Sequence, residues 1–433
     1  MEWYVVTILA FAAMFAIVFA KVPIAFGLGL LGLVGLWAFL DGRAALLFLG
    51  NHPFSVLQNF TLVAVPMFIL MAEVILFTGI SGDLFDLFNK WLNRLPGGLA
   101  ISGIMACAGF GAMSGSSTAT AATIGAVSIP EMQKRGYDNR LVAGSIAAGG
   151  GLGILIPPSL PLIIYGVITE TNVGMLFMAG LLPGIIMAVL DAAYVGISCK
   201  RNPRRAPLIP EGVSRRDRIL AARKVWPVTL LIFLVLGSIY LGWATVTEAA
   251  AVGAFGSLCV AMVYRKLNWD NLRGAMLAAV KTTSVVIMIA FGALLFGYFL
   301  TVAQVPQQLA GFLVGLPVNR WVIMIGINLL LLLLGCVLDV ATLILVVLPI
   351  LFPAVTALGF DPVWFGVVFV VNIEIALETP PIGMNLFVVK GISDIPIGDV
   401  MRGAIPFVFA EAIVLALVMA FPQISLWIPS LMG

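Results

Sequence analysis

The chain has little of the chemistry that most enzymes need. Among its 433 residues there is a single histidine, His52, and the four cysteines are far apart with no CxxC or CxxH pair. These absences exclude an HExxH zinc site and a Ser-His-Asp triad, and they predict neither a structural zinc site nor a disulfide framework. The phosphate-binding pattern GxxxxGK[ST] is also missing. The sequence therefore predicts a protein that is not an enzyme and does not use ATP.

Charge is equally scarce. Only 10% of the residues are charged and 62% are hydrophobic, whereas soluble domains have about 25% charged residues. Apolar runs of about 20 residues, the length that crosses the hydrocarbon core, recur from 3–20 to 407–426. The first run is not a secretory signal, because it is too long and Glu2 replaces the usual positive cluster. The chain is thus a multi-pass membrane protein, and its net charge of +3 gives no reason to expect nucleic acid as a partner.

The apolar runs predict an all-α integral membrane protein with ten spanning helices and two re-entrant hairpins. The spans are expected at 3–20, 22–40, 61–80, 141–168, 175–198, 226–243, 247–264, 279–302, 363–389 and 403–428. Two further apolar stretches, 97–130 and 320–354, are interrupted by small or polar residues at Met113 to Thr118 and at Val337 to Thr342. Each of them predicts a helix pair that enters and leaves on one side.

The distribution of Lys and Arg gives the orientation. With an outside N-terminus, all of them except Arg43 and Arg320 fall in inside segments, namely Lys21, 81–96, 131–140, 199–224, 265–281 and 390–402. This is the bias that the positive-inside rule requires. The basic loop 199–224 is then a cytoplasmic connector, with contact to anionic membrane lipid as the lesser alternative.

An internal repeat appears when the sequence is shifted by 223 residues. Pro, Gly and Asp positions then coincide: Pro130 with Pro353, Gly136 with Gly359, Asp138 with Asp361, Pro157-Pro158 with Pro380-Pro381, Gly180 with Gly403, and Pro183 with Pro406. Five spans separate the hairpins, so the repeats have opposite orientations, as in many secondary transporters. The expected units are scaffold helices 1–80, a transport repeat 81–198, the loop 199–224, scaffold helices 225–302 and a transport repeat 303–433.

Polar chemistry concentrates at the hairpin tips. The segment Gly111 to Thr120 holds several hydroxyls, and its equivalent, Asp339 to Thr342, aligns Asp339 with Ser116. Irregular polar backbone at membrane depth requires protein or a water-filled cavity around it. Close helix packing is the plainer explanation for small residues, and for Gly115 alone it is the better one.

A helix broken at a double proline follows each hairpin, at Gly149 to Ser159 and at Asn372 to Pro381. Proline leaves carbonyl oxygens unpaired, and such oxygens suit a hard cation, although a simple kink is the alternative. Helix N-termini after the tips and breaks would attract an anion. No Lys or Arg is predicted in this central layer, so the anion's charge would be offset by helix ends, hydroxyls, Asn385 and bound cations.

Several acidic residues are predicted at membrane depth. Asp339, Glu374 and Glu378 lie among the tips and breaks and are the functional candidates. The others are interpreted as scattered, with interfacial or inter-helix hydrogen-bonding roles; they are Glu73, Asp191, Glu248 and Glu411.

Four motifs carry a resemblance to a known family. They are GAMSGSSTATAATIG at 111–125, GILIPPS at 153–159, LGCVLDVATLILVVLPILFP at 334–353 and ETPPIGMNLFVV at 378–389. With these residues the chain resembles, over nearly its whole length, the large membrane subunit of tripartite ATP-independent periplasmic (TRAP) transporters, within the wider ion-transporter superfamily.

The resemblance implies an elevator-type, sodium-coupled importer in the bacterial inner membrane. Its expected partners are a small four-helix membrane subunit and a periplasmic solute-binding protein, and its expected substrates are C4-dicarboxylates, keto acids or sialic acids. A partner-independent carboxylate symporter remains an alternative, as does a channel or scaffold protein.

The resemblance also implies positions for the ligands. Sodium is expected at Ser116, Ser117 and the carbonyls from Gly149 to Pro157, including Gly150 and Gly153, and at Asp339, Thr342, Asn372 and Thr379. Ser114 is a further hydroxyl of the first ion site. The substrate is expected between the tips and the breaks, beside Ser114, Gly115, Pro158, Ser159, Pro381 and Asn385.

Overall fold

The structure is a computed structural model that describes residues 3–40, 42–207, 212–380 and 383–431. Every regular element in these ranges is a helix. Seven of the described helices are long and apolar enough to span a membrane, or eight if a bent pair counts as one span. The all-helical membrane fold is confirmed, whereas the predicted number of ten spans is not.

The N-terminal part contains one helix that was not predicted. Its elements are α1 (Trp3–Phe19), α2 (Ile24–Phe39), α3 (Gly42–Leu57), the short 3-10 helix η1 (Phe60–Val63), α4 (Ala64–Leu76) and α5 (Ile80–Leu92). Helix α3 occupies a stretch that we read as a connection, because its polar residues interrupt the apolar run. The η1–α4 unit and α5 meet at an angle of 71°, so the predicted span 61–80 ends in a sharp bend.

The first transport repeat follows the predicted order of hairpin, broken helix and long helix. It consists of α6 (Gly98–Ser114), α7 (Ser117–Lys134), α8 (Asn139–Leu155), α9 (Leu160–Thr169) and α10 (Val173–Arg201), with the 3-10 helix η2 (Pro203–Arg205) after it. The hairpin turns within the predicted interruption, and α8 stops just before Pro157-Pro158. Small polar residues and proline therefore end these helices where the sequence indicated.

Three long helices connect the repeats. They are α11 (Arg215–Tyr240), α12 (Val246–Val263) and α13 (Trp269–Val302), and each begins several residues before or close to the predicted start. Helices α11 and α12 start with capping boxes, Ser214 with Asp217 and Thr245 with Glu248. Such boxes satisfy N–H groups that the first turn leaves free, which explains why α11 begins in its charged segment. In the second box, Glu248 accepts hydrogen bonds from the N–H and the hydroxyl of Thr245.

The second repeat has the same order with a more irregular hairpin. Its elements are α14 (Val305–Val314), α15 (Arg320–Gly335), α16 (Val340–Thr342), the π-helix η3 (Leu343–Val347), α17 (Leu348–Ala357), α18 (Pro362–Glu378), α19 (Met384–Gly391), α20 (Ile397–Ala420) and α21 (Gln423–Ser430). The equivalent residues Asp138 and Asp361 cap α8 and α18, each accepting hydrogen bonds from N–H groups of the first turn. The two repeats thus use the same N-cap, an aspartate, at these equivalent positions.

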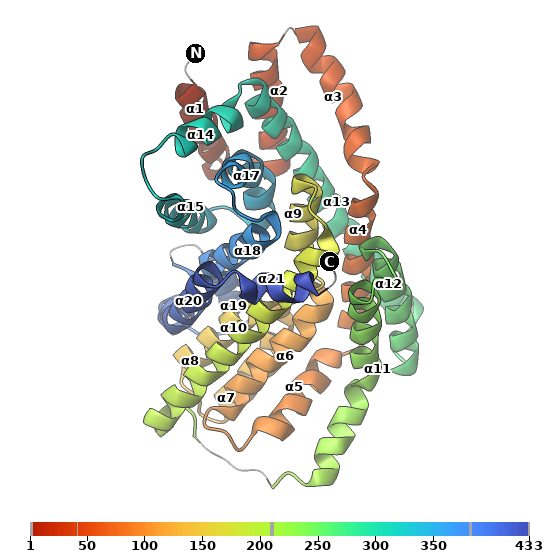
Figure 1. Ribbon diagram of the computed structural model, residues 1–433. Helices are drawn as coiled ribbons and strands as arrows, with labels where there is room; N and C mark the ends of the chain where they lie inside the picture. Colours follow the sequence, from red (N-terminus) through yellow and green to blue (C-terminus); the bar gives the residue numbers. More distant parts are fainter. Residues whose placement is uncertain (1–2, 41, 208–211, 381–382, 432–433) are drawn as a thin grey trace.

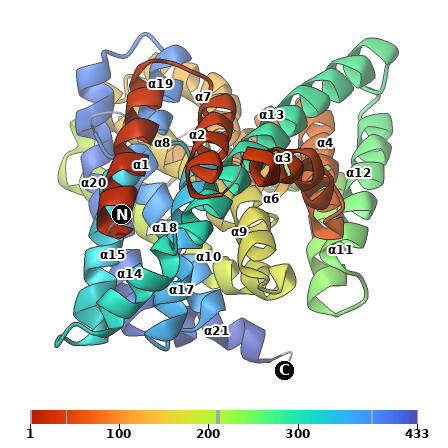
Figure 2. The same cartoon turned by 90° about the horizontal axis from the view of Figure 1, so that it is seen from above.

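The helices form a block with a layer beside it. Figure 1 shows α3, α4, α12 and α11 along one side, and in Figure 2 α11, α12 and one end of α13 project away from the block. Helix α13 packs along α2, and α12 packs on α4 and α11. Within the block, α8 is central, because it contacts α6, α7, α18 and α20. This places the first broken helix against both repeats.

Candidate functional site

The first hairpin tip is closed by its own hydroxyl groups. Helix α6 ends at Ser114, and the next residue, Gly115, has a left-handed backbone with φ of 59°. Ser116 caps the next helix by accepting a hydrogen bond from the N–H of Ala119 at 3.4 Å. The Oγ of Ser114 lies 2.7 Å from Oγ1 of Thr120. Ser114, Ser117 and Thr120 are buried. The tip is therefore a compact turn at the centre of the fold.

The first broken helix lies directly against this tip. A Cβ added to Gly153 would lie 2.7 Å from Oγ1 of Thr120 and 2.8 Å from the carbonyl oxygen of Ser116. One added to Gly150 would lie 3.2 Å from the carbonyl oxygen of Ser117, and one added to Gly115 would lie 2.7 Å from that of Pro158. The structure thus brings together the predicted residues of the first repeat, because glycines allow the two backbones to touch.

Ser159 has a capping role at this break. Its Oγ accepts a hydrogen bond from the N–H of Leu162 at 3.4 Å and donates one to the carbonyl of Ile154. The N–H of Leu160 reaches the carbonyl of Gly115 at 3.4 Å. The start of α9 is therefore attached to the hairpin tip, and its dipole begins there.

The second repeat brings its predicted residues together only in part. Asp339 accepts hydrogen bonds from the N–H of Ala341, at 3.1 Å, and from the hydroxyl of Thr342. Asn372 instead donates to Asn328 of α15 and to the carbonyl of Val368, and Thr379 donates to the carbonyl of Ile375 in its own helix. The predicted residue Pro381 lies outside the described residues.

One side chain joins the two repeats. Asn385, in the first turn of α19, donates hydrogen bonds to Oγ of Ser117 at 2.6 Å and to the carbonyl of Ala147 at 3.3 Å. Asn385 is fully buried. A residue of the second broken helix is thereby fixed on the tip of the first hairpin.

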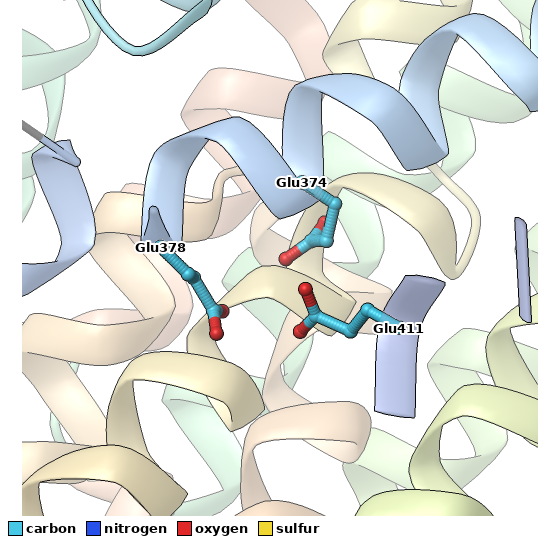
Figure 3. A group of neighbouring side chains, drawn as sticks. All are labelled: Glu374, Glu378 and Glu411. Atoms are coloured by element: carbon cyan, nitrogen blue, oxygen red, sulfur yellow. The ribbon is translucent and has the colours of Figure 1, made fainter. Parts of the chain in front are cut away.

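The structure corrects one interpretation of the acidic residues. Glu374 and Glu378 on α18 face Glu411 on α20, with one carboxylate oxygen of each within 4.8 Å of the others (Figure 3). Asp191 on α10 is close enough to interact electrostatically with all three. Glu411 and Asp191 are therefore not scattered: they belong to a buried carboxylate cluster, while Asp339 lies apart from it.

A signal for this cluster was present in the sequence. Glu374 and Glu378 are four residues apart and so share a helix face. Under the shift of 223 residues, Glu411 is equivalent to Ala188, which lies one turn before Asp191 on α10. What the sequence did not give is the packing of α10, α18 and α20 against one another.

The described cavities lie away from the first tip. A cavity of about 760 Å³ is lined by Asn59, Glu170, Asn172 and Thr245 among others, at the ends of α9 and α12. A second cavity, of about 290 Å³, lies between α13 and the second hairpin, beside Leu345 and Pro349. None of the predicted ion or substrate residues lines either of them.

Comparisons with known proteins agree with this architecture. The family model described as "Tripartite ATP-independent periplasmic transporter, DctM component" matches residues 11–424. The chain is 37% identical over 381 residues to a C4-dicarboxylate TRAP transporter large permease protein of Pseudomonas aeruginosa, covering 88% of each. It is 35% identical over 416 residues to the sialic acid TRAP transporter large permease protein of Vibrio cholerae, covering 96% of each.

A solved structure supports the fold independently. The YdaH transporter of Alcanivorax borkumensis superposes with a TM-score of 0.61 over 90% of this chain and 89% of that one, at 14% sequence identity. The relatives named above are transporter permease components and not enzymes. With its several apolar helices, this chain is a multi-pass protein of the bacterial inner membrane. The chain therefore belongs to the DctM family, the large permease component of TRAP transporters.

Proposed function

We propose that this permease imports a small carboxylate anion of the C4-dicarboxylate, keto acid or sialic acid class by sodium symport in an elevator cycle. Relatives are named for C4-dicarboxylate, for sialic acid and, in Escherichia coli, for 2,3-diketo-L-gulonate at 32% identity. Another is named for isethionate, which is a sulfonate, and the chain spans 63% of its length. The feature common to these solutes is an acidic group that is ionised at neutral pH.

The observation that carries the proposal is the hydrogen bond between Asn385 and Ser117. It places the N-terminus of α19 beside the N-terminus of α7, while the N–H of Leu160 attaches the start of α9 to the same tip. Helix N-termini present free N–H groups and partial positive charge. A carboxylate held among Ser114, Gly115, Pro158, Ser159, Pro381 and Asn385 would meet donors from both repeats.

Bound sodium would provide the positive charge that the central layer lacks. Even one charged group at the bilayer centre costs about 2.5 kcal/mol or more on insertion scales, so cations beside the anion offset a real penalty. We assign one site to each repeat: Ser116, Ser117, Gly150 and Gly153 in the first, and Asp339, Thr342, Asn372 and Thr379 in the second. Sodium binding would then assemble the anion site before the solute arrives.

The partners follow from the same family. The proposed cycle uses a small four-helix membrane subunit beside the scaffold helices and a periplasmic binding protein that delivers the anion. In this cycle the block around α8 moves through the lipid bilayer relative to the layer of α2, α4 and α11 to α13.

Uptake into proteoliposomes tests the proposal. The permease with its small subunit and a loaded binding protein should take up the anion under an inward sodium gradient, and each omission should reduce uptake strongly. Robust sodium-driven uptake by the permease alone would instead favour a partner-independent symporter. Flux that ignores the sodium gradient and needs no binding protein would favour a channel.

Sodium binding is measured separately by thermal unfolding in detergent, with potassium as the control. Ser116→Ala should weaken stabilisation by sodium, Asp339→Asn should weaken it more because it removes a charge, and the double variant should nearly abolish it. Absence of any sodium-specific stabilisation, together with uptake driven by a proton gradient alone, would overturn the two-site assignment. Asp339, Glu374 and Glu378 would then be proton-relay candidates.

A further inference from the structure

The buried carboxylate cluster is not explained by the proposed ion and anion sites. Glu374, Glu378, Glu411 and Asp191 are each 0% exposed, and none of their eight carboxylate oxygens has a hydrogen-bond partner among the described residues. The ion pairs of the described chain involve other acids, at Asp83, Asp86, Glu131 and Asp399. Among the described residues, no cationic side chain therefore compensates the four carboxyl groups.

Such an arrangement needs a compensating charge. An ionised carboxylate that leaves water without a partner is strongly disfavoured, and each further carboxylate nearby adds repulsion. Buried charges in proteins are consequently paired or coordinate metals. Buried carboxyl groups either hold protons or are compensated by a ligand of opposite charge, and the experiment below distinguishes the two.

The shape of the core adds a second observation. A Cβ at Gly151 would lie 1.2 Å from Oε1 of Glu374 and 3.0 Å from Oε1 of Glu378. Gly151 and Glu374 are equivalent under the shift of 223 residues, so equivalent positions of the two repeats meet here and the glycine leaves the space that the carboxylate fills. Ion sites of inverted-repeat transporters occur at such repeat interfaces.

A further buried oxygen lies at the rim of the cluster. Asn385 lies beside Glu378. The Nδ2 group of Asn385 donates hydrogen bonds to Ser117 and Ala147, whereas its Oδ1 atom is buried without a hydrogen-bond partner among the described residues. It is an amide and adds no charge of its own. An unpaired amide oxygen next to unpaired carboxylates is the donor set that a hard cation prefers.

We propose that Glu374, Glu378 and Glu411 bind a divalent cation of the Ca²⁺ class, with Asp191 as a flanking carboxylate. Three carboxylates can supply six oxygens, within the six to eight that Ca²⁺ takes at about 2.3–2.6 Å. Opposed ligands of such an ion are about 4.6–5.2 Å apart, a span that accommodates oxygens lying within 4.8 Å of one another. Mg²⁺ requires shorter bonds of about 2.0–2.1 Å and usually keeps several waters, so a set of three carboxylates favours Ca²⁺.

The cation connects α18 and α20 of the second repeat and lies next to α10 of the first, where Asp191 flanks it. Its role is structural: it fixes the core around α8 as one body. The assignment uses none of the residues proposed as sodium ligands and does not require sodium coupling. It can therefore fail or hold independently of the proposed function.

Metal analysis and thermal unfolding of the complete permease in detergent test the site. Protein purified without chelator should contain bound Ca²⁺, and removal by EGTA should lower the unfolding temperature, with recovery on adding Ca²⁺ but not Mg²⁺ or choline chloride. Glu411→Gln keeps the shape and removes one charge. It should raise the Ca²⁺ concentration for half-recovery by at least about tenfold, since even groups outside the ligand shell change metal affinity by that much.

Glu73→Gln is the matched control, because Glu73 is a half-buried acid on α4 outside the cluster. It should leave the Ca²⁺ response unchanged. If Glu411→Gln does not fold, the metal content and EGTA response of the unaltered protein decide the matter. Protein that is free of Ca²⁺ and indifferent to EGTA overturns the proposal. Recovery by sodium alone, or a stability that follows only pH, overturns it as well.

Discussion

The two hairpin tips occupy equivalent positions in the repeat and yet are held in different ways. The first tip uses hydroxyls, a left-handed glycine and contact with α8, and it is linked to the second repeat through Asn385. The second tip places Asp339 where the first has Ser116, and its hydrogen bonds stay within four residues. The two repeats thus share the hairpin turn but differ in the side chains at its tip. The first tip is attached to the rest of the core, whereas the hydrogen bonds of the second tip stay within the tip itself.

The largest expected effect is at Gly115, where the first tip needs a left-handed residue. Gly115→Ala combines backbone strain of about 1–2 kcal/mol with an approach of 2.7 Å to the carbonyl of Pro158. Gly242 has a similar φ of 68° and nothing within 4 Å, so Gly242→Ala should show the strain alone. We expect Gly115→Ala to lower the free energy of unfolding by about 3 kcal/mol, since overpacking adds to strain.

Denaturant unfolding in detergent measures both variants. The second tip has no left-handed glycine among its described residues, so the comparison predicts no counterpart there. Equal losses for the two variants would mean that the contact with Pro158 does not hold the first tip.

The next effect tests the contact between the first tip and α8. Gly153→Ala would place a methyl group 2.8 Å from the carbonyl oxygen of Ser116, and overpacking of this kind costs about 1–3 kcal/mol. Gly326→Ala on α15 is the control, because nothing lies within 4 Å of that position. Only Gly153→Ala should lower the unfolding temperature, and a similar loss in the control would contradict a specific contact.

A smaller effect is expected for the link between the repeats. Asn385→Ala leaves the buried Ser117 hydroxyl without its donor, which costs about 1–3 kcal/mol. A double-mutant cycle with Ser117→Ala should give an interaction energy of about 0.5 kcal/mol or more. An additive result would show that Asn385 stabilises α19 without holding the first tip.

The smallest effect separates capping from ion binding. Ser116→Ala removes an N-cap and should cost about 1 kcal/mol, whereas Asp339→Asn retains a good cap and should be nearly neutral. Both are measured by thermal unfolding in sodium-free, potassium-containing buffer. In sodium the order should reverse, with Asp339→Asn losing more of the stabilisation. The same order in both buffers would refute a charge role for Asp339.

The sequence located the breaks of the fold well. Runs such as Ser114 to Ser117 and the double prolines end helices through local backbone chemistry, and the structure has its turns at the predicted interruptions. The helix α3 was missed because its polar residues break the apolar pattern used to find spans. The predicted number of ten spans is not confirmed, since apolar length alone does not distinguish straight helices from short or bent ones.

Local residue chemistry was sufficient for the membrane fold and the broken helices, because proline, glycine and apolar length act within a few residues of themselves. The family came from the resemblance of four motifs. Tertiary packing decided which distant side chains meet. Asn385 reaches Ser117 across 268 residues of sequence, and Asp191, Glu374, Glu378 and Glu411 come together only because α10, α18 and α20 pack side by side. A carboxylate's position in a helix is local information, whereas its neighbours depend on the whole fold.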